Sequence, residues 1–212
     1  MLEAGAHTYA FHGHAIVSVD DRIAAASGQT PPSLRNDADW QRFQAALDRA
    51  AVTALGRLAH EANPNPKGRN RLVLSSSPRG IERRADAWWW NPAEASLAEA
   101  LLAAAPKGGI VAVPGGMRVF DYFLGIGFDE FHLGRVAGAW VPDGIPVFSA
   151  VHEGKSASAI LATHGLTRQP TEMLDPEAGV SLTVWRRAPQ SAAPPVRVQT
   201  DLRFLRMRRG SP

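Results

Sequence analysis

Two adjacent glycines form the part of the sequence best suited to binding chemistry. Gly115 and Gly116 follow an apolar run at 109–113 and precede an amphipathic stretch at 117–124. Glycine has no Cβ, so another molecule can approach its backbone closely. A helix beginning at Met117 would direct free N–H groups and the positive end of its dipole at the same place, which suits a phosphate. The pattern indicates a nucleotide site, although a tight strand-to-helix turn without a ligand would have the same pattern.

Histidines near the N-terminus are the second group that could do chemistry. His12 and His14 lie two residues apart in a predicted strand, so they share one face, and His7 is near them. Imidazole is a common ligand of transition metals. No carboxylate is suitably spaced beside these histidines, and we therefore expect no metal site. We expect His132 to be an ordinary strand residue rather than a catalyst.

Strands and helices that could position these residues alternate up to about residue 125. One helix is expected from a cap at Asn36 or Asp37 to Arg49, and another is expected after Gly116. A third is expected from a cap at Asn91 to Ala105, with Pro92 at its first position and Glu94 closing a capping box. Apolar runs predict strands at 9–19, 52–55, 71–75, 87–90, 109–113, 131–136, 147–151 and 180–186. Pro, Gly and Asn mark loops at 25–36 and 63–70. The strand containing Trp88-Trp89-Trp90 is expected to be half-buried, at a subunit contact rather than stacked on nucleobases.

This alternation predicts an α/β fold with a mostly parallel central sheet and helices on both faces. Strands dominate after residue 125, which favours an antiparallel edge strand or hairpin at the C-terminal side. We expect one domain at 1–190, followed by a Pro-containing linker and an arginine-rich tail at 191–212.

The composition narrows the classes of function. Residues 196–212 carry five arginines and one aspartate, so that tail accounts for the net charge of +3 and the remainder is close to −1. A nearly neutral body argues against a nucleic-acid partner. There is no cysteine, no apolar run of membrane-spanning length and no secretory signal pattern, so we expect a cytoplasmic protein without a membrane partner.

Several short motifs occur in order between about residues 9 and 187. They are Ser18-Val-Asp-Asp-Arg-Ile-Ala24, Leu34-Arg-Asn-Asp-Ala-Asp-Trp40, Gly56-Arg57 followed by Glu61, Gly68-Arg69-Asn-Arg-Leu-Val-Leu-Ser75-Ser76, Gly115-Gly116-Met-Arg-Val-Phe120, Phe128-Asp-Glu-Phe-His-Leu133 and Val147-Phe148. Together they resemble motifs of the dihydrofolate reductase superfamily, which includes dihydrofolate reductases and the reductase domain of riboflavin biosynthesis.

The resemblance implies NADPH as the cofactor and a small heterocyclic substrate that accepts hydride at a C=N or C=O bond. It assigns cofactor contacts to Gly56, Arg57, Ser75, Ser76, Gly115, Gly116, Met117, Arg118 and Val119. In this assignment Arg57, Ser75 and Ser76 would hold the 2′-phosphate, because a guanidinium and two hydroxyls suit a phosphate dianion. Riboflavin-type relatives further imply a homodimer.

The resemblance also implies a substrate site. Asp37 would be the catalytic carboxylate that orients the substrate and helps to protonate it, with Asp39 as the alternative if the register differs by two. Asp37 could equally be a helix cap. Ile16 and Gln41 would line the substrate, and Arg69 would pair with a substrate carboxylate unless it is a solvated loop residue.

Departures from the family pattern keep three functions open. Ala59 and Gly134 stand where the family has threonines, Met117 replaces a third glycine, Gln41 replaces an aromatic residue, and Pro114 precedes the glycine pair. These changes weaken the case for folate itself. The alternatives are a pterin or dihydrofolate reductase, a riboflavin-pathway reductase of a ribosylaminopyrimidine phosphate, and a non-catalytic nucleotide-binding protein with the same fold.

Overall fold

The computed structural model describes residues 1–188, so the predicted tail at 191–212 lies outside the described residues. The strands are β1 Leu2–Ala4, β2 His7–Val17, β3 Arg22–Ala24, β4 Val52–Gly56, β5 Arg71–Leu74, β6 Ile81–Arg83, β7 Trp88–Trp90, β8 Gly109–Val113, β9 Glu130–Val136, β10 Ile145–Pro146, β11 Leu166–Asp175 and β12 Val180–Arg187. The helices are α1 Asp37–Arg49, α2 Arg57–Ala62, α3 Leu97–Ala104, α4 Met117–Ile126 and α5 Ala157–Thr163, with 3-10 turns at Pro32–Leu34 and Ser149–Glu153.

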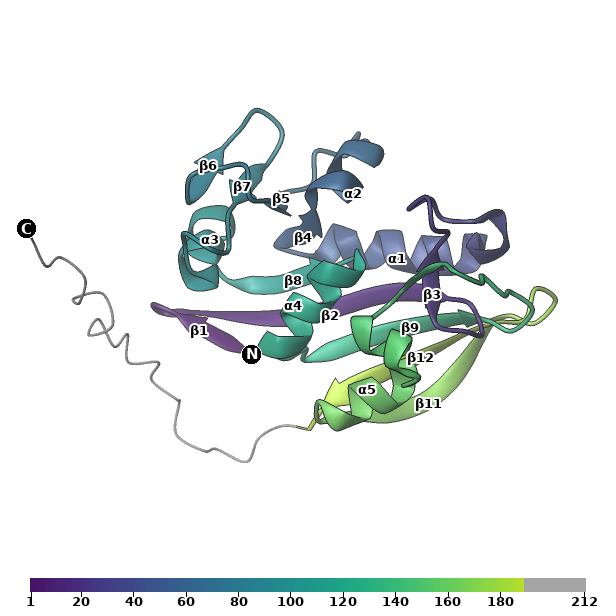
Figure 1. Cartoon of the computed structure of the whole chain (residues 1–212). Helices are drawn as coiled ribbons and strands as arrows, with labels where there is room; N and C mark the ends of the chain where they lie inside the picture. Colours follow the sequence, from purple (N-terminus) through teal and green to yellow (C-terminus); the bar gives the residue numbers. More distant parts are fainter. Residues whose placement is uncertain (189–212) are drawn as a thin grey trace, which may run out of the picture.

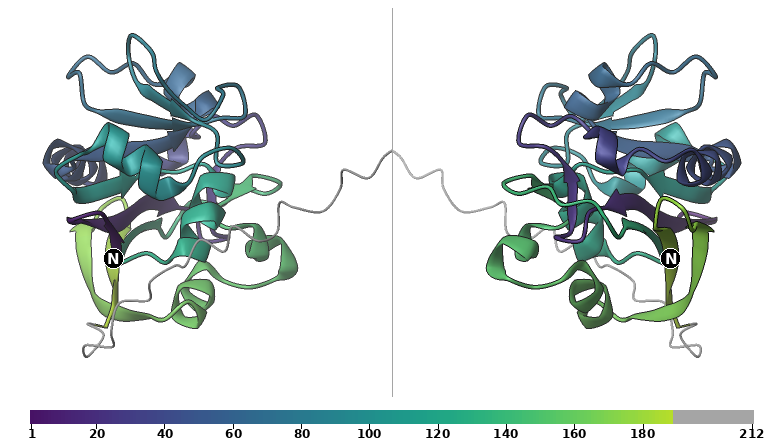
Figure 2. Two further views of the ribbon diagram at one scale, coloured as in Figure 1. Left: turned by 90° about the vertical axis from the view of Figure 1, so that its left-hand side faces the viewer. Right: turned by 90° about the vertical axis from the view of Figure 1, so that its right-hand side faces the viewer.

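A large mixed sheet runs through the molecule in the order β11-β12-β9-β2-β8-β4-β5-β7-β6 (Figure 1). The pairs from β9 through to β7 are parallel, whereas β6, β12 and β11 add antiparallel edges. The side views place the blue strands of residues 50–90 at one end and the yellow-green C-terminal hairpin at the other (Figure 2). The predicted α/β fold with a mostly parallel sheet and an antiparallel C-terminal hairpin is confirmed.

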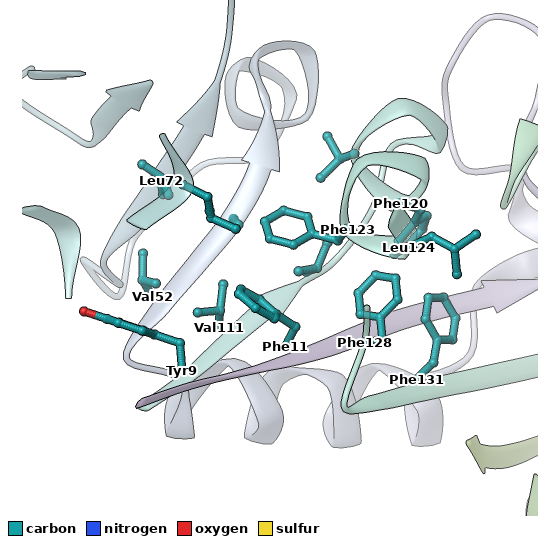
Figure 3. Close-up of a cluster of buried hydrophobic side chains, with 14 of the residues drawn as sticks. Tyr9, Phe11, Val52, Leu72, Val111, Phe120, Phe123, Leu124, Phe128 and Phe131 are labelled. Carbon is teal, nitrogen blue, oxygen red and sulfur yellow. The ribbon is translucent and has the colours of Figure 1, made fainter. Parts of the chain in front are cut away.

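The two faces of the sheet differ in chemistry because side chains alternate along each strand. Tyr9 and Phe11 of β2 lie on the face that carries α4, within a cluster rich in phenylalanine (Figure 3). His14 lies on the opposite face, where its ring is 6.1 Å from that of Phe43 in α1. The sheet is therefore covered by helices on both faces, with the aromatic core on the α4 side.

Local signals explain where two of the helices begin. Asn36 caps α1 as predicted, with its side chain accepting hydrogen bonds from the backbone of Ala38 and Asp39. The predicted start of α3 at Asn91 is wrong, because Ser96 caps that helix and forms a capping box with Glu99. Asn91 instead closes a local turn by accepting a hydrogen bond from Ala93 N–H.

The C-terminal third contains elements that the sequence did not indicate. The predicted strand at 147–151 is wrong, since a 3-10 turn begins at Ser149. β11 was not predicted, because it is an exposed edge strand whose residues are mainly polar and which contains Pro170. Helix α5 was missed as well, although Ser156 caps it by accepting a hydrogen bond from Ala159 N–H.

The three consecutive tryptophans belong mainly to the interior of the chain. Trp90 is fully buried in the main core, and its indole N–H donates to the carbonyl of Ala95. Trp89 is also buried, with its ring edge-on to His60. The expected half-burial of the strand is therefore wrong for these two residues, whereas Trp88 is half-buried. Within residues 1–188, no helix has both the length and the apolar character needed to cross a membrane.

Candidate functional site

The turns that follow the parallel strands gather at one edge of the sheet. Neighbouring parallel strands point the same way, so their carboxyl ends meet at one edge, where ligands bind in open α/β sheets. Here that edge receives the turn from β4 into α2, the loop after β5 and the turn from β8 into α4. Most of the cofactor residues expected from the resemblance lie in these three segments.

The turn between β8 and α4 has a backbone that only glycine adopts easily. Gly115 has φ +128° and Gly116 has φ +86°, both outside the region that other residues favour. A Cβ on Gly115 would lie 3.3 Å from the ring of Phe120. No side chain caps α4 at Gly116, so the N–H groups of Met117 and Arg118 have no capping acceptor, whereas that of Val119 donates to the carbonyl of Gly116. This terminus has the arrangement expected of an anion site.

Val119 connects the glycine turn to the turn after β4. A Cβ on Gly56 would lie 3.3 Å from its Cγ2, and one on Gly116 would lie 3.7 Å from it. The structure thus brings Gly56, Gly116 and Val119 together. Arg57, the residue after Gly56, is exposed and forms an ion pair with Glu61, in which one guanidinium nitrogen lies 3.0 Å from each carboxylate oxygen. The Arg57 guanidinium therefore already has a partner.

The serines after β5 lie at the same edge. Gly56 pairs with Leu74 in the sheet, so Ser75 follows on the strand next to Arg57. The hydroxyl of Ser75 lies 3.1 Å from that of Ser77 and accepts a hydrogen bond from Ser77 N–H. Ser76 is exposed, as are Gly116 and Arg118, whereas Met117 is half-buried.

The two candidate carboxylates of α1 occupy different environments. Asp37 is exposed, in the first turn of the helix. Asp39 is half-buried and approaches β9 so closely that a Cβ on Gly134 would lie 2.7 Å from its Oδ1. Burial raises the pKa of Asp39 above its ordinary value. The arrangement therefore favours Asp39, the alternative residue, over Asp37 as the carboxylate of the site.

The three expected substrate contacts differ in their availability. Ile16 is half-buried and pairs with Gly134, so it lies beside the position that Asp39 approaches. Gln41 is exposed on α1. Arg69 already pairs with Asp48, at 2.6 Å, and donates to the carbonyl of Gln44. A substrate carboxylate would have to compete with Asp48 for this guanidinium.

The residues at 18–21 form hydrogen bonds that connect several elements, rather than a ligand site. Asp21, in a left-handed conformation with φ +59°, accepts hydrogen bonds from the Arg135 guanidinium and from the N–H of Ala157. The carboxylate of Asp20 accepts from the Ser18 hydroxyl and the N–H of Val141. This motif therefore has a structural reason: it ties the end of β2 to β9, α5 and the 137–146 loop.

The histidines of β2 meet partners that sequence spacing could not show. Parallel pairing of β2 with β9 sets His12 opposite Glu130 and His14 opposite His132. The rings of His14 and His132 stack with 4.5 Å between centroids, and burial lowers the pKa of His14 to about 3. The expectation that no carboxylate lies beside these histidines is wrong, because β9 supplies Glu130. The third histidine of that expectation, His7, does not belong to this group.

A separate hollow of about 330 Å³ lies away from the glycine turns. It is lined by the later part of α4, including Leu124 and Gly125, and by Ile160 and Thr163 of α5. Sequence reasoning gave no signal for it. Since the hollow does not reach the carboxyl edge of the parallel strands, it does not bear on the candidate site.

Comparison with solved structures identifies the fold. A dihydrofolate reductase from Enterococcus faecalis, complexed with NADP(H) and RAB-propyl, matches over 84% of this chain and 96% of its own, with TM-score 0.58 and 18% identity. A riboflavin biosynthesis protein from a Shewanella species matches over 85% of this chain and 99% of its own, with TM-score 0.57 and 17% identity.

A third structure is a diaminohydroxyphosphoribosylaminopyrimidine deaminase/5-amino-6-(5-phosphoribosylamino)uracil reductase from Thermotoga maritima. It matches over 85% of this chain and 57% of its own, with TM-score 0.55 and 16% identity. No protein family profile and no curated protein matches the sequence. The chain thus has a dihydrofolate reductase-like fold, which the motifs in the sequence predicted.

Proposed function

We propose that this protein is an NADPH-dependent reductase that transfers hydride to a C=N or C=O bond of a small heterocycle. The observation that carries the proposal is the placement of a half-buried carboxylate, Asp39, at the sheet edge that also carries the uncapped N-terminus of α4. A binding site for an anion and a carboxylate that can hold a proton are the two parts such a reaction requires of the protein. One of the similar structures is complexed with NADP(H), which supports the choice of cofactor.

The residues at the edge fit a dinucleotide with an extra phosphate. Gly115 and Gly116 leave room for a phosphate against the first-turn N–H groups of Met117 and Arg118. Val119, whose N–H donates to the carbonyl of Gly116, lies beside them. Arg57, Ser75 and Ser76 follow neighbouring strands and would hold the 2′-phosphate, with Arg57 exchanging Glu61 for it. When bound, the cofactor would supply hydride from its nicotinamide ring.

Asp39 would orient the substrate and keep a proton at its carboxyl group. Its raised pKa means that the protonated form persists to higher pH than in an exposed aspartate, which suits proton transfer to a ring nitrogen. Gly134 makes this position accessible, because any larger residue there would displace the carboxylate. Ile16 would form an apolar wall beside it.

A ribosylaminopyrimidine phosphate is the second candidate substrate class. The ion pair that Arg69 forms with Asp48 favours this class over folate. The ion pair with Asp48 occupies the guanidinium that would otherwise hold a glutamate carboxylate. The Arg69 interaction thus contributes to α1 packing and not to a free carboxylate site.

The direct test is titration of the protein with NADPH and with NADH, followed by quenching of tryptophan fluorescence. We expect saturable binding that favours NADPH, followed by turnover of a dihydropterin or an aminopyrimidine ribosyl phosphate. Binding without turnover of either class would identify a non-catalytic nucleotide-binding protein. Failure to bind either dinucleotide would refute the cofactor assignment.

Replacing Arg57 by alanine should weaken NADPH binding on the order of 10-fold and leave NADH binding nearly unchanged. The reason is that a charge-assisted contact to the 2′-phosphate contributes about 1.5–3 kcal/mol, part of which is offset by the lost Glu61 pair. Arg42→Ala is the matched control, because both side chains are 48% exposed and each pairs with a glutamate. Equal losses for the two dinucleotides would show that Arg57 does not read the 2′-phosphate.

A further inference from the structure

Two histidines and a glutamate come together on the α1 face of the sheet, outside the proposed reductase site. The ligand-forming atoms of His12, Glu130 and His132 all lie within 4.8 Å of one another. Two of these atoms, His132 Nε2 and Glu130 Oε2, are hydrogen-bonded to each other at 3.1 Å. We propose that these three side chains form a binding site for a divalent transition metal ion.

The sheet itself fixes the positions of the three ligands. β2 and β9 are adjacent parallel strands in the middle of the sheet (Figure 1), and His12 is directly opposite Glu130. His132 is two residues further along β9, so its side chain is on the same face as that of Glu130. Ligands on central strands are held by the backbone ladder, so the site is built before any ion arrives.

The spacing of the ligand atoms suits a small ion. Bonds of about 2.0–2.2 Å from a transition metal to imidazole nitrogen and carboxylate oxygen place neighbouring ligand atoms roughly 3.0–3.4 Å apart. The separation of 3.1 Å between His132 Nε2 and Glu130 Oε2 falls in this interval. An ion could therefore replace that hydrogen bond with little movement of either side chain, while His12 turns its ring towards it.

Neighbouring groups orient the glutamate and the histidines. Arg186 of β12 donates to Glu130 Oε1 at 3.0 Å, which leaves Oε2 directed at His132. The ring of His14 stacks on His132 and limits its rotation. Partners that fix the orientation of metal ligands are a regular feature of metal sites. The side chains of Glu130 and His132 are about one quarter exposed, so an ion can enter from solvent.

The composition of the ligand set indicates which metals would bind. Two imidazoles and one carboxylate favour zinc, cobalt, nickel or iron over magnesium and calcium, which prefer oxygen ligands alone. Three protein ligands leave the remaining coordination positions to water. This site lies on the same sheet face as Asp39 but nearer the amino ends of β2 and β9, so it is distinct from the proposed reductase site.

The test is titration of chelator-treated full-length protein with Co²⁺ and Zn²⁺, followed by the visible absorption of bound Co²⁺ and by calorimetry. We expect one ion per chain and competition between the two metals. His132→Ala and His12→Gln should each weaken binding at least 10-fold, because each removes one of three ligands. His152→Ala is the control, since His152 is an exposed histidine in the 3-10 turn at 149–153.

Melting temperatures in the absence of metal establish that the variants are folded. If His132→Ala does not fold, the metal-binding comparison uses His12→Gln alone. The proposal is overturned if the wild-type protein binds no ion, or if binding survives unchanged in every one of these ligand variants that folds. NADPH binding should be the same in wild type and His12→Gln, so failure of the metal site and failure of the reductase proposal can be told apart.

Discussion

Asp39→Asn is expected to reduce kcat/KM for the heterocyclic substrate by roughly 10²- to 10³-fold while leaving NADPH binding intact. An asparagine has nearly the same shape but cannot hold and release a proton, and positioned acid–base groups contribute about this much to rate. Asp39 is the half-buried carboxylate beside Gly134, so its loss affects the reacting part of the site. The measurement is steady-state reduction of whichever substrate class the wild-type protein turns over.

Asp37→Asn is the matched control, because Asp37 lies two residues away on the same helix turn and is exposed. We expect it to retain activity within about twofold. Equal losses in the two variants, or a larger loss in Asp37→Asn, would return the catalytic role to Asp37. A structural role for Asp39 would appear as a loss of stability together with activity.

The pH dependence of stability distinguishes a structural role of Asp39 from a catalytic one. The folded-state pKa of Asp39 is raised by burial, so the carboxyl group costs nothing below the unfolded-state pKa and destabilises the fold as pH rises through the folded-state pKa. Asp39→Asn removes this cost. The variant should therefore be at least as stable as wild type in urea unfolding at pH 7, with the difference vanishing in acid.

Gly13→Ala is expected to destabilise the protein by about 3 kcal/mol. A Cβ at this position in β2 would lie 2.3 Å and 2.5 Å from two ring carbons of Phe131, and 3.1 Å from a ring carbon of Phe128. Both rings are fully buried in the aromatic core, so neither can move without displacing others, and overpacking of this kind is costly (Figure 3). Urea unfolding would measure the change.

Gly125→Ala provides a comparison of opposite sign. Gly125 lies in α4 with no atom within 4 Å of an added Cβ, so alanine there should raise stability by a few tenths to about 1 kcal/mol. If Gly13→Ala were as stable as wild type, Phe131 could not pack tightly against Gly13 of β2.

Local signals made much of the fold predictable from the sequence. Asn36 caps α1 with its own side chain, and the glycine pair at 115–116 requires a backbone that other residues avoid, so both features are encoded within a few residues. The short motifs that predicted the dihydrofolate reductase-like fold are likewise each encoded within a few residues. The start of α3 was misplaced because Asn91 and Ser96 both carry capping signals, and the capping box forms at Ser96 with Glu99 while Asn91 closes a turn.

The site was less predictable because its geometry depends on residues far apart in the sequence. The sequence favoured Asp37 over Asp39, and only the approach of α1 to Gly134 reveals the half-buried position of Asp39. Likewise Glu130 joins His12 only through the pairing of β2 with β9. β11 escaped prediction because an exposed polar edge strand has no apolar alternation to reveal it.

The position of β2 in the sheet has a consequence for synthesis of the chain. β2 leaves the ribosome long before β8 and β9, yet Tyr9 pairs with Gly109 and Gly13 pairs with Phe131. β1 pairs only with His7–Tyr9, so Phe11 and the residues after it have no strand partner until β8 and β9 are made, about one hundred residues later. Contacts so distant in sequence slow folding, and strands left unpaired meanwhile are prone to aggregate. We therefore expect nascent chains that end before β8 to need chaperones to remain in solution.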